Sequence, residues 1–219
     1  MYAAALFDMD GLLLDTERVY LRTFLQAAED LKFPFPDQLD GIFRSMVGLR
    51  AKDSGQIMER MLGPHVDLDD FNTAWSRHTS AALRGEMPLR PMVMETLMRV
   101  SEVGIPCAVA TSTRTSFAID HLERAGIAKF FQTVIGGEQV NKGKPDPEIY
   151  LRAAEALGVD IEVCAAFEDS NTGIRAAVTS GARAVQIPDM VDPTDEVKAL
   201  GHLIAPTLLD GAKRIDLIK

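Results

Sequence analysis

Seven residues with acidic, basic or hydroxyl side chains follow short apolar segments of the sequence. In chain order they are Asp8 and Asp10, Thr111 and Ser112, Lys144, and Glu168 and Asp169. The apolar segments are typical of buried strands, and parallel sheets bind their ligands at the carboxyl ends of strands. Because four predicted strands are each followed by such polar groups, we expect these residues to form one site.

The acidic residues occur in two close pairs, which indicates a cation. An isolated aspartate after a strand is most often a turn residue or a helix cap. Asp8 and Asp10, however, are separated by one residue, and Glu168 stands beside Asp169, so the members of each pair repel each other. Hard oxygen ligands suit Mg²⁺, which we predict as the cofactor. Asp8 and Asp169 are the favoured ligands; Glu168 and the backbone carbonyl of Asp10 are further candidates.

Asp8 and Asp10 also have a spacing that suits stepwise phosphoryl transfer. A metal-bound carboxylate can attack phosphorus and form an aspartyl-phosphate, which divides one difficult step into two. The cation neutralises charge on the transferred group. A second carboxyl group two residues away can protonate the leaving alkoxide and then deprotonate the water that hydrolyses the intermediate. We predict Asp8 as the nucleophile and Asp10 as the acid and base.

A lysine and two hydroxyl residues are the candidates for binding the phosphate. Lys144 lies in the segment 143–147, whose prolines stiffen the loop before a predicted helix. An exposed lysine is normally just solvated, but this loop follows a predicted strand, so pairing with phosphate is favoured. Lys142 is the less favoured alternative. Thr111 and the Ser112 amide stand at a strand-to-helix junction, where anionic oxygens bind readily.

The segment between the first strand and position 88 has a helical pattern. Its apolar residues recur at spacings of three and four, and prolines and glycines interrupt them. The predicted helices cover 18–31, 39–47, 54–62 and 71–83. No strand pattern occurs in this segment, so we predict an all-helical domain at 16–87.

From position 88 onward the pattern alternates between helix and strand. The predicted helices cover 93–103, 116–125, 147–157 and 172–180, and the predicted strands cover 106–110, 133–135, 163–167 and 184–187. A glycine follows each of these helices, as is typical of helix ends. Such alternation predicts parallel βαβ units. The predicted fold class is α/β: a doubly wound parallel core at 1–15 and 88–219, with the helical cap inserted after the first strand.

The composition restricts the class of protein and its partners. The 219 residues are 47% hydrophobic, enough for a buried core, and carry a formal net charge of −9 without a basic run, which argues against nucleic acid as a partner. No apolar stretch has the length of a membrane span and no basic segment precedes the first apolar run, so we expect no membrane partner and a cytoplasmic protein. Cys107 and Cys164 lie in apolar runs, which predicts buried thiols rather than a zinc site.

Taken in order, these motifs resemble those of the haloacid dehalogenase-like (HAD) superfamily. Residues 7–17 resemble its first motif, 109–112 the second, 143–147 the third and 167–170 the fourth. The resemblance spans the whole predicted core. It implies a Rossmann-like core, a helical cap of the first type, Mg²⁺ and an aspartyl-phosphate intermediate.

Within this superfamily, the second acid of the first motif separates the activities. Dehalogenases, phosphonatases and P-type ATPases lack an acid at the position of Asp10, whereas phosphatases and phosphomutases carry it. Sugar phosphomutases of the β-phosphoglucomutase type have a histidine where this chain has Tyr20, and their Gly-x-Ser-Arg signature is replaced at 48–51. Both differences favour a phosphatase. The resemblance is greatest to the branch of β-phosphoglucomutase-like and pseudouridine-5′-phosphatase-like members.

We therefore predict a Mg²⁺-dependent phosphomonoester hydrolase whose partner is a small phosphorylated metabolite, a sugar phosphate or a nucleotide-like compound. Glu17, Tyr20 and Arg50 of the cap are the candidates for substrate contacts, and a cap that closes over its substrate favours a small one. We expect a monomer or weak homodimer. The alternative is a β-phosphoglucomutase-like sugar phosphomutase. A receiver-like signalling domain is a weaker alternative, since receivers carry adjacent acids and no helical insert.

Overall fold

The computed structural model describes residues 2–85 and 87–219, and its centre is a six-stranded parallel sheet. The strands are β1 (Ala4–Phe7), β2 (Cys107–Ala110), β3 (Thr133–Ile135), β4 (Cys164–Glu168), β5 (Arg183–Gln186) and β6 (Leu203–Ile204), in the spatial order β3-β2-β1-β4-β5-β6. Strand β1 is central and pairs with β2 on one side and β4 on the other. The strand order therefore reverses beside β1, which is where ligands bind in sheets of this class.

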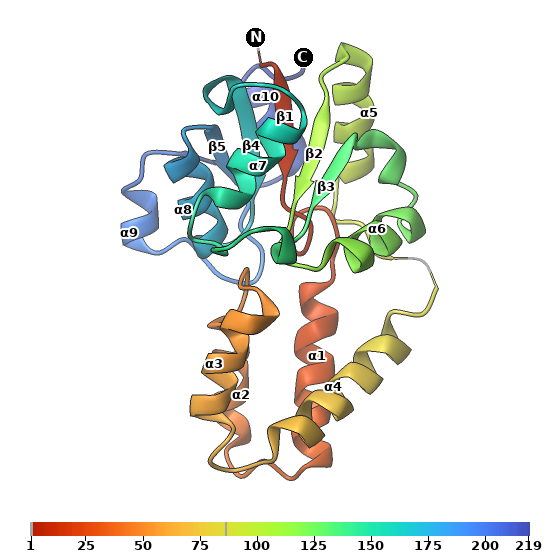
Figure 1. Cartoon of the computed structure of the whole chain (residues 1–219), viewed down its shortest axis with the longest axis vertical. Helices are drawn as coiled ribbons and strands as arrows, with labels where there is room; N and C mark the ends of the chain where they lie inside the picture. The colour runs from red at the N-terminus through yellow and green to blue at the C-terminus, as the bar shows by residue number, and fades with distance from the viewer. Residues whose placement is uncertain (1, 86) are drawn as a thin grey trace.

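Helices cover both faces of the sheet (Figure 1). One face carries α5 (Val93–Val103), α6 (Thr115–Arg124) and α10 (Leu208–Arg214), and the other carries α7 (Glu148–Ala156), α8 (Asn171–Ser180) and α9 (Asp195–Lys198). Ala5 and Phe7 of β1 belong to the first of the two hydrophobic clusters, and Ala4 and Leu6 belong to the second. A strand buried on both faces must be apolar throughout, which explains its continuous apolar sequence.

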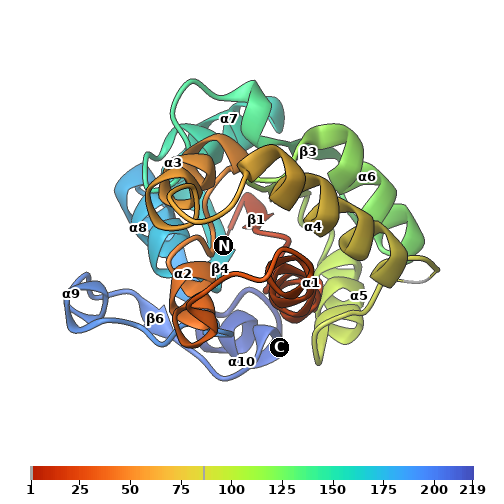
Figure 2. The same cartoon turned by 90° about the horizontal axis from the view of Figure 1, so that it is seen from below.

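The cap is a separate group of helices beneath the carboxyl ends of the strands (Figures 1 and 2). It contains α1 (Glu17–Asp30), α2 (Leu39–Arg44), α3 (Ala51–Met61) and α4 (Leu68–Ala82). The buried members of its hydrophobic cluster all come from the cap. The ring of Phe24 in α1 lies edge-on to Phe71 and Trp75 of α4, with both centroid distances at 5.1 Å. These rings fix α1 against α4.

Two chain segments that lie side by side join the cap to the core. Leu14 and Leu89 form an antiparallel bridge between these segments. Asp189, from the loop after β5, forms ion pairs with Arg18 of the cap at 2.8 Å and with Arg90 of the second segment at 2.9 Å. These contacts tie both connecting segments and the first cap helix to the core.

The observed elements follow the sequence prediction closely, with differences at some ends. The helix expected over 39–47 ends at Arg44. Strand β6 and helices α9 and α10 are absent from the prediction, because each has seven residues or fewer and shows no clear periodicity. Cys107 and Cys164 are free and buried, as predicted. Within the described ranges, no helix combines the length and apolar composition that crossing a membrane requires.

Candidate active site

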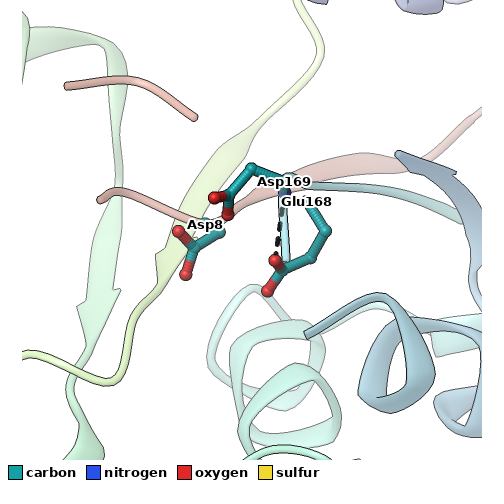
Figure 3. Close-up of side chains that lie close together, drawn as sticks. All are labelled: Asp8, Glu168 and Asp169. Atoms are coloured by element: carbon teal, nitrogen blue, oxygen red, sulfur yellow. Dashed lines mark hydrogen bonds between the residues drawn. The ribbon is translucent and has the colours of Figure 1, made fainter. Parts of the chain in front are cut away.

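The polar residues predicted at the strand ends lie together at the carboxyl edge of the sheet. Asp8 follows β1, Thr111 follows β2, and Glu168 is the last residue of β4, with Asp169 directly after it. Lys144 reaches the same point from the loop between β3 and α7. Figure 3 shows the three carboxylates of Asp8, Glu168 and Asp169 close together where β1 and β4 end.

Asp8, Glu168 and Asp169 form a buried acidic cluster. Each places a carboxylate oxygen within 4.8 Å of the others, and the three residues are at most 6% exposed. Burial removes the hydration of a charged carboxylate and so raises its pKa. It raises the pKa of Asp8 to about 8 and that of Asp169 well above its ordinary value, and the neighbouring carboxylates add to both effects. The cluster therefore requires positive charge to stay ionised.

Lys144 provides one such charge. Its Nζ lies 2.5 Å from Asp8 Oδ1 and 2.5 Å from Glu168 Oε1, and it donates to the carbonyl oxygen of Ala110 at 3.0 Å. Burial alone would lower the pKa of Lys144, but the charges of the two carboxylates raise it above its ordinary value. The side chain is therefore an ammonium that holds the nucleophile candidate in place. Lys142, the alternative, has a side chain that is 77% exposed.

The hydrogen bonds of Glu168 and Asp169 separate their roles. Glu168 Oε1 also accepts from the Tyr150 hydroxyl at 2.7 Å, while Oε2 accepts from the Asp169 amide at 3.1 Å and from Ser170 Oγ at 3.2 Å. Among the described residues, none donates a hydrogen bond to the Asp169 carboxylate or to Asp8 Oδ2. Glu168 is thus occupied with positioning Lys144, whereas Asp8 and Asp169 keep oxygens available for a ligand.

The donor set of this cluster fits a divalent cation. Three carboxylates and one ammonium leave an excess of negative charge in a place that water screens poorly. Oxygen donors without sulfur or imidazole suit a hard cation. Asp8, through Oδ2, and Asp169 are the residues that would hold it, since these oxygens accept no hydrogen bond from the described residues.

Asp10 stands beside the cluster and is oriented by two hydroxyl groups. Thr16 Oγ1 donates to Asp10 Oδ1 at 2.6 Å, and Thr113 Oγ1 donates to Oδ2 at 2.7 Å. Asp10 also faces the cavity described below, so it can exchange a proton with a bound molecule. Neither threonine was among the predicted site residues. Their role depends on how the chain folds back after β1 and β2, and no local sequence pattern signals it.

Thr111 and Ser112 form the other side of the site. The Thr111 amide donates to the carbonyl oxygen of Ile135 within the sheet. The Thr113 amide donates to Thr111 Oγ1 at 3.1 Å. Ser112 Oγ donates to the carbonyl oxygen of Gly48 at 2.9 Å, which links core and cap. The Ser112 amide has no hydrogen-bond acceptor within the described ranges, so it can bind an anionic oxygen.

A cavity of about 830 Å³ lies between this site and the cap. The core residues on its wall include Asp8, Asp10, Thr111 and Ser112, while the cap supplies most of the remaining wall. Its volume is in the range of small-molecule sites. Lys144, which is 3% exposed, is not on this wall.

Comparison with known proteins decides the family. Residues 5–187 match the family described as haloacid dehalogenase-like hydrolases. The chain belongs to this family. A phosphorylated carbohydrates phosphatase of Thermotoga maritima is 32% identical over 216 residues, which are 99% of this chain and 98% of the relative. The family is one of hydrolases and the relative is a phosphatase, and together they support a phosphatase.

Two solved structures confirm the predicted fold class. CbbY from Rhodobacter sphaeroides, crystallised with xylulose-1,5-bisphosphate, has a TM-score of 0.73 at 25% identity, over 94% of this chain and 95% of that chain. A β-phosphoglucomutase from Clostridium difficile has a TM-score of 0.76 over 94% and 92% of the two chains. Its 19% identity shows a shared fold alone.

Two of the three predicted cap residues of this HAD phosphatase line the cavity. Glu17 is 7% exposed, and burial, with the charges of Asp10 and Asp8, raises its pKa to about 8. Tyr20 lines the cavity one helical turn further along α1. Both side chains are therefore placed where a bound molecule would contact them.

Arg50, the third, lies outside the cavity. Its Nε pairs with Asp53 at 2.8 Å, and its Nη1 donates to the carbonyl oxygen of Val140 at 3.2 Å. Its guanidinium packs on Gly143, where any larger residue would meet it. Arg50 thus docks the cap on the loop that carries Lys144.

Proposed function

We propose that this phosphatase is a Mg²⁺-dependent phosphomonoester hydrolase that forms an aspartyl-phosphate on Asp8. The observation that carries the proposal is the hydrogen bonding of the Asp8 carboxylate and its position on the cavity wall. Lys144 holds Oδ1, while Oδ2 accepts no hydrogen bond from the described residues, and the residue lines the cavity. A carboxylate oriented through one oxygen and free at the other is arranged to attack a bound phosphorus atom.

The phosphoryl group would be bound from several sides. Asp8, Asp169 and the backbone carbonyl of Asp10 would hold Mg²⁺, which when bound neutralises charge on the transferred phosphoryl group. The Thr111 hydroxyl and the Ser112 amide would donate to the remaining phosphoryl oxygens. Supporting this arrangement, all five contributors stand at the ends of β1, β2 and β4.

Asp10 would move the proton in both half-reactions. In the first, an Asp8 oxygen attacks phosphorus while Asp10 gives its proton to the leaving oxygen of the ester. In the second, Asp10 takes a proton from water, whose oxygen attacks phosphorus and releases phosphate and free Asp8. Thr16 and Thr113 would keep the Asp10 carboxyl group oriented through both steps, in line with their hydrogen bonds to it.

We propose a small phosphorylated carbohydrate or nucleotide-like compound as the substrate. A cavity of about 830 Å³ suits a molecule of this size, and the Thermotoga maritima relative is a phosphatase of phosphorylated carbohydrates. The alternative, a sugar phosphomutase, would use the same core residues and return the phosphate to a sugar.

The test is the release of free phosphate from a panel of sugar phosphates, nucleotides and pseudouridine 5′-phosphate, with and without Mg²⁺. We expect Mg²⁺-dependent release that Asp8→Asn lacks. Release that persists in Asp8→Asn would overturn the mechanism. Interconversion of sugar phosphates without free phosphate would instead establish the mutase.

A further inference from the structure

The wall of the cap cavity is acidic and, within the described ranges, carries no lysine, arginine or histidine. Its carboxylates are Asp8, Asp10, Glu17, Glu59 and Asp69. The first three stand near the phosphoryl site, and the last two lie in the last turn of α3 and the first turn of α4. Figure 1 shows that the loop joining these two helices is at the end of the cap remote from the sheet. A molecule in this cavity therefore meets negative charge at both ends.

Three cations close to the cavity are bonded to other groups. Arg18 pairs with Asp189 at 2.8 Å on the core side of the connecting segments. Arg50 pairs with Asp53 at 2.8 Å and packs on the core loop. Lys144 is 3% exposed and is already bonded to two carboxylates. On the described wall of the cavity, only a phosphate at the core site would therefore meet a favourable charge.

The uncharged walls of the cavity have two kinds of surface. Asn72, Ser76 and Thr79 line it from α4 at the three- and four-residue spacing that places side chains on one helix face. Met46 and Met58, from the segments on the other side of the cap, line it with apolar surface. Amide and hydroxyl groups can bond the hydroxyl groups of a polyol, and the methionines can pack on its C–H groups.

We infer that the cavity accepts esters with a single phosphate on an uncharged or amine-bearing polyol, and rejects bisphosphates and phosphocarboxylates. The inference rests on the proposed function and specifies its substrate class. A second anionic group would lose part of its hydration and gain no cationic partner in return. The chain is expected to differ in this respect from CbbY, which was crystallised with a bisphosphate. A mutase that requires a bisphosphate activator is disfavoured for the same reason.

The test compares kcat/KM for matched pairs with Mg²⁺ present: glucose 6-phosphate against glucose 1,6-bisphosphate, and glycerol 3-phosphate against 3-phosphoglycerate. We expect the member with the second anionic group to be at least about tenfold poorer in each pair, the size of effect that a repulsive charge produces in a narrow site. Equal values within the pairs would overturn the inference and leave the phosphatase intact. Absence of phosphate release from every ester would overturn the proposed function and this inference with it.

Single lysine substitutions on α4 test whether charge causes the selectivity. Ser76→Lys and Asn72→Lys place a cation on the cavity wall at two depths about 6 Å apart along the helix. We expect at least one of them to raise kcat/KM for the bisphosphate about tenfold relative to the monophosphate. Thr73→Lys is the matched control, because Thr73 is exposed on the same helix but does not line the cavity. Selectivity against the bisphosphate that neither cavity lysine changes, or that Thr73→Lys changes equally, would contradict the electrostatic explanation.

Discussion

The core and the cap meet at one cavity but contribute to it differently. On the core side, three of the four acidic side chains are held by protein donors: Lys144 contacts Asp8 and Glu168 at 2.5 Å, and Asp10 accepts hydrogen bonds from two threonine hydroxyls. On the cap side, Asn72 and Ser76 are exposed side chains that line the cavity. The comparison shows that the proposed reacting groups are oriented before any substrate binds, whereas the cap offers contacts that a substrate would complete.

The largest expected effect comes from removing the proposed nucleophile, Asp8. Asp8→Asn keeps the size of the side chain but not its nucleophilic carboxylate, so we expect kcat to fall on the order of 10⁴-fold or more. Steady-state phosphate release measures the change. Ser76→Ala in the cap is the comparison, and its rate with a small activated ester should change less than about threefold, since such an ester makes few cap contacts. Similar losses in both variants would contradict the division between core and cap.

A smaller effect is expected from removing the proposed acid and base, Asp10. Asp10→Asn should lower kcat by roughly 10²–10³-fold with an alkyl phosphate, whose leaving oxygen needs a proton. With p-nitrophenyl phosphate, whose leaving group departs as an anion, the first half-reaction should be nearly normal. A rapid-mixing burst of nitrophenolate followed by slow turnover would show this. Equal losses in the first step for both esters would exclude Asp10 as the acid.

The buried lysine should matter for stability as well as for activity. Lys144→Met leaves Asp8 and Glu168 without their shared cation, and breaking a buried ion pair costs about 3–5 kcal/mol of unfolding free energy. Urea unfolding at neutral pH, with a chelator present, measures the loss. The exposed Lys142→Met is the matched control, with an expected change within about 0.5 kcal/mol. Equal losses would mean that Lys144 is not the partner of the cluster.

The smallest expected effect is a dependence of the unfolding free energy on pH, which arises from Glu17 of the cap. Burial raises the pKa of Glu17 to about 8 from its ordinary value of 4.5. Between pH 6 and pH 8 the folded protein therefore keeps a proton that the unfolded chain has already lost, so stability falls as pH rises. This group alone should cost about 2 kcal/mol of unfolding free energy across that interval.

Glu17→Gln tests this dependence, because the amide does not titrate. Urea unfolding of both proteins at pH 6 and pH 8, with a chelator, should show a smaller loss in the variant. Parallel losses in the two proteins would show that the side chain of Glu17 is ionised in the folded state at pH 6.

Much of the core site could be predicted because its residues directly follow apolar strands. Asp8, Thr111 and Asp169 are each one residue beyond a strand, and the strands of a parallel sheet end at one edge. The partners that orient them could not be predicted in the same way. Tyr150 is fully buried in α7 and fits the apolar pattern of that helix, although its hydroxyl donates to Glu168.

The cap was harder to predict, because the direction of a side chain there depends on how helices dock. Arg50 stands in a turn after Gly48, and only the packed structure shows that its guanidinium turns toward Gly143 instead of the cavity. The cavity residues Asn72 and Ser76 have no distinguishing sequence pattern, since exposed polar residues occupy most outer helix faces.

The most direct test of the account is to locate the covalent phosphate. Wild-type protein would be mixed with a sugar phosphate and Mg²⁺, quenched within one turnover, and treated with borohydride, which reduces an acyl phosphate to an alcohol. The account predicts that mass spectrometry finds homoserine at position 8, and that Asp8→Asn and samples without Mg²⁺ lack it. Reduction at another carboxylate, or full phosphate release in Asp8→Asn, would contradict it.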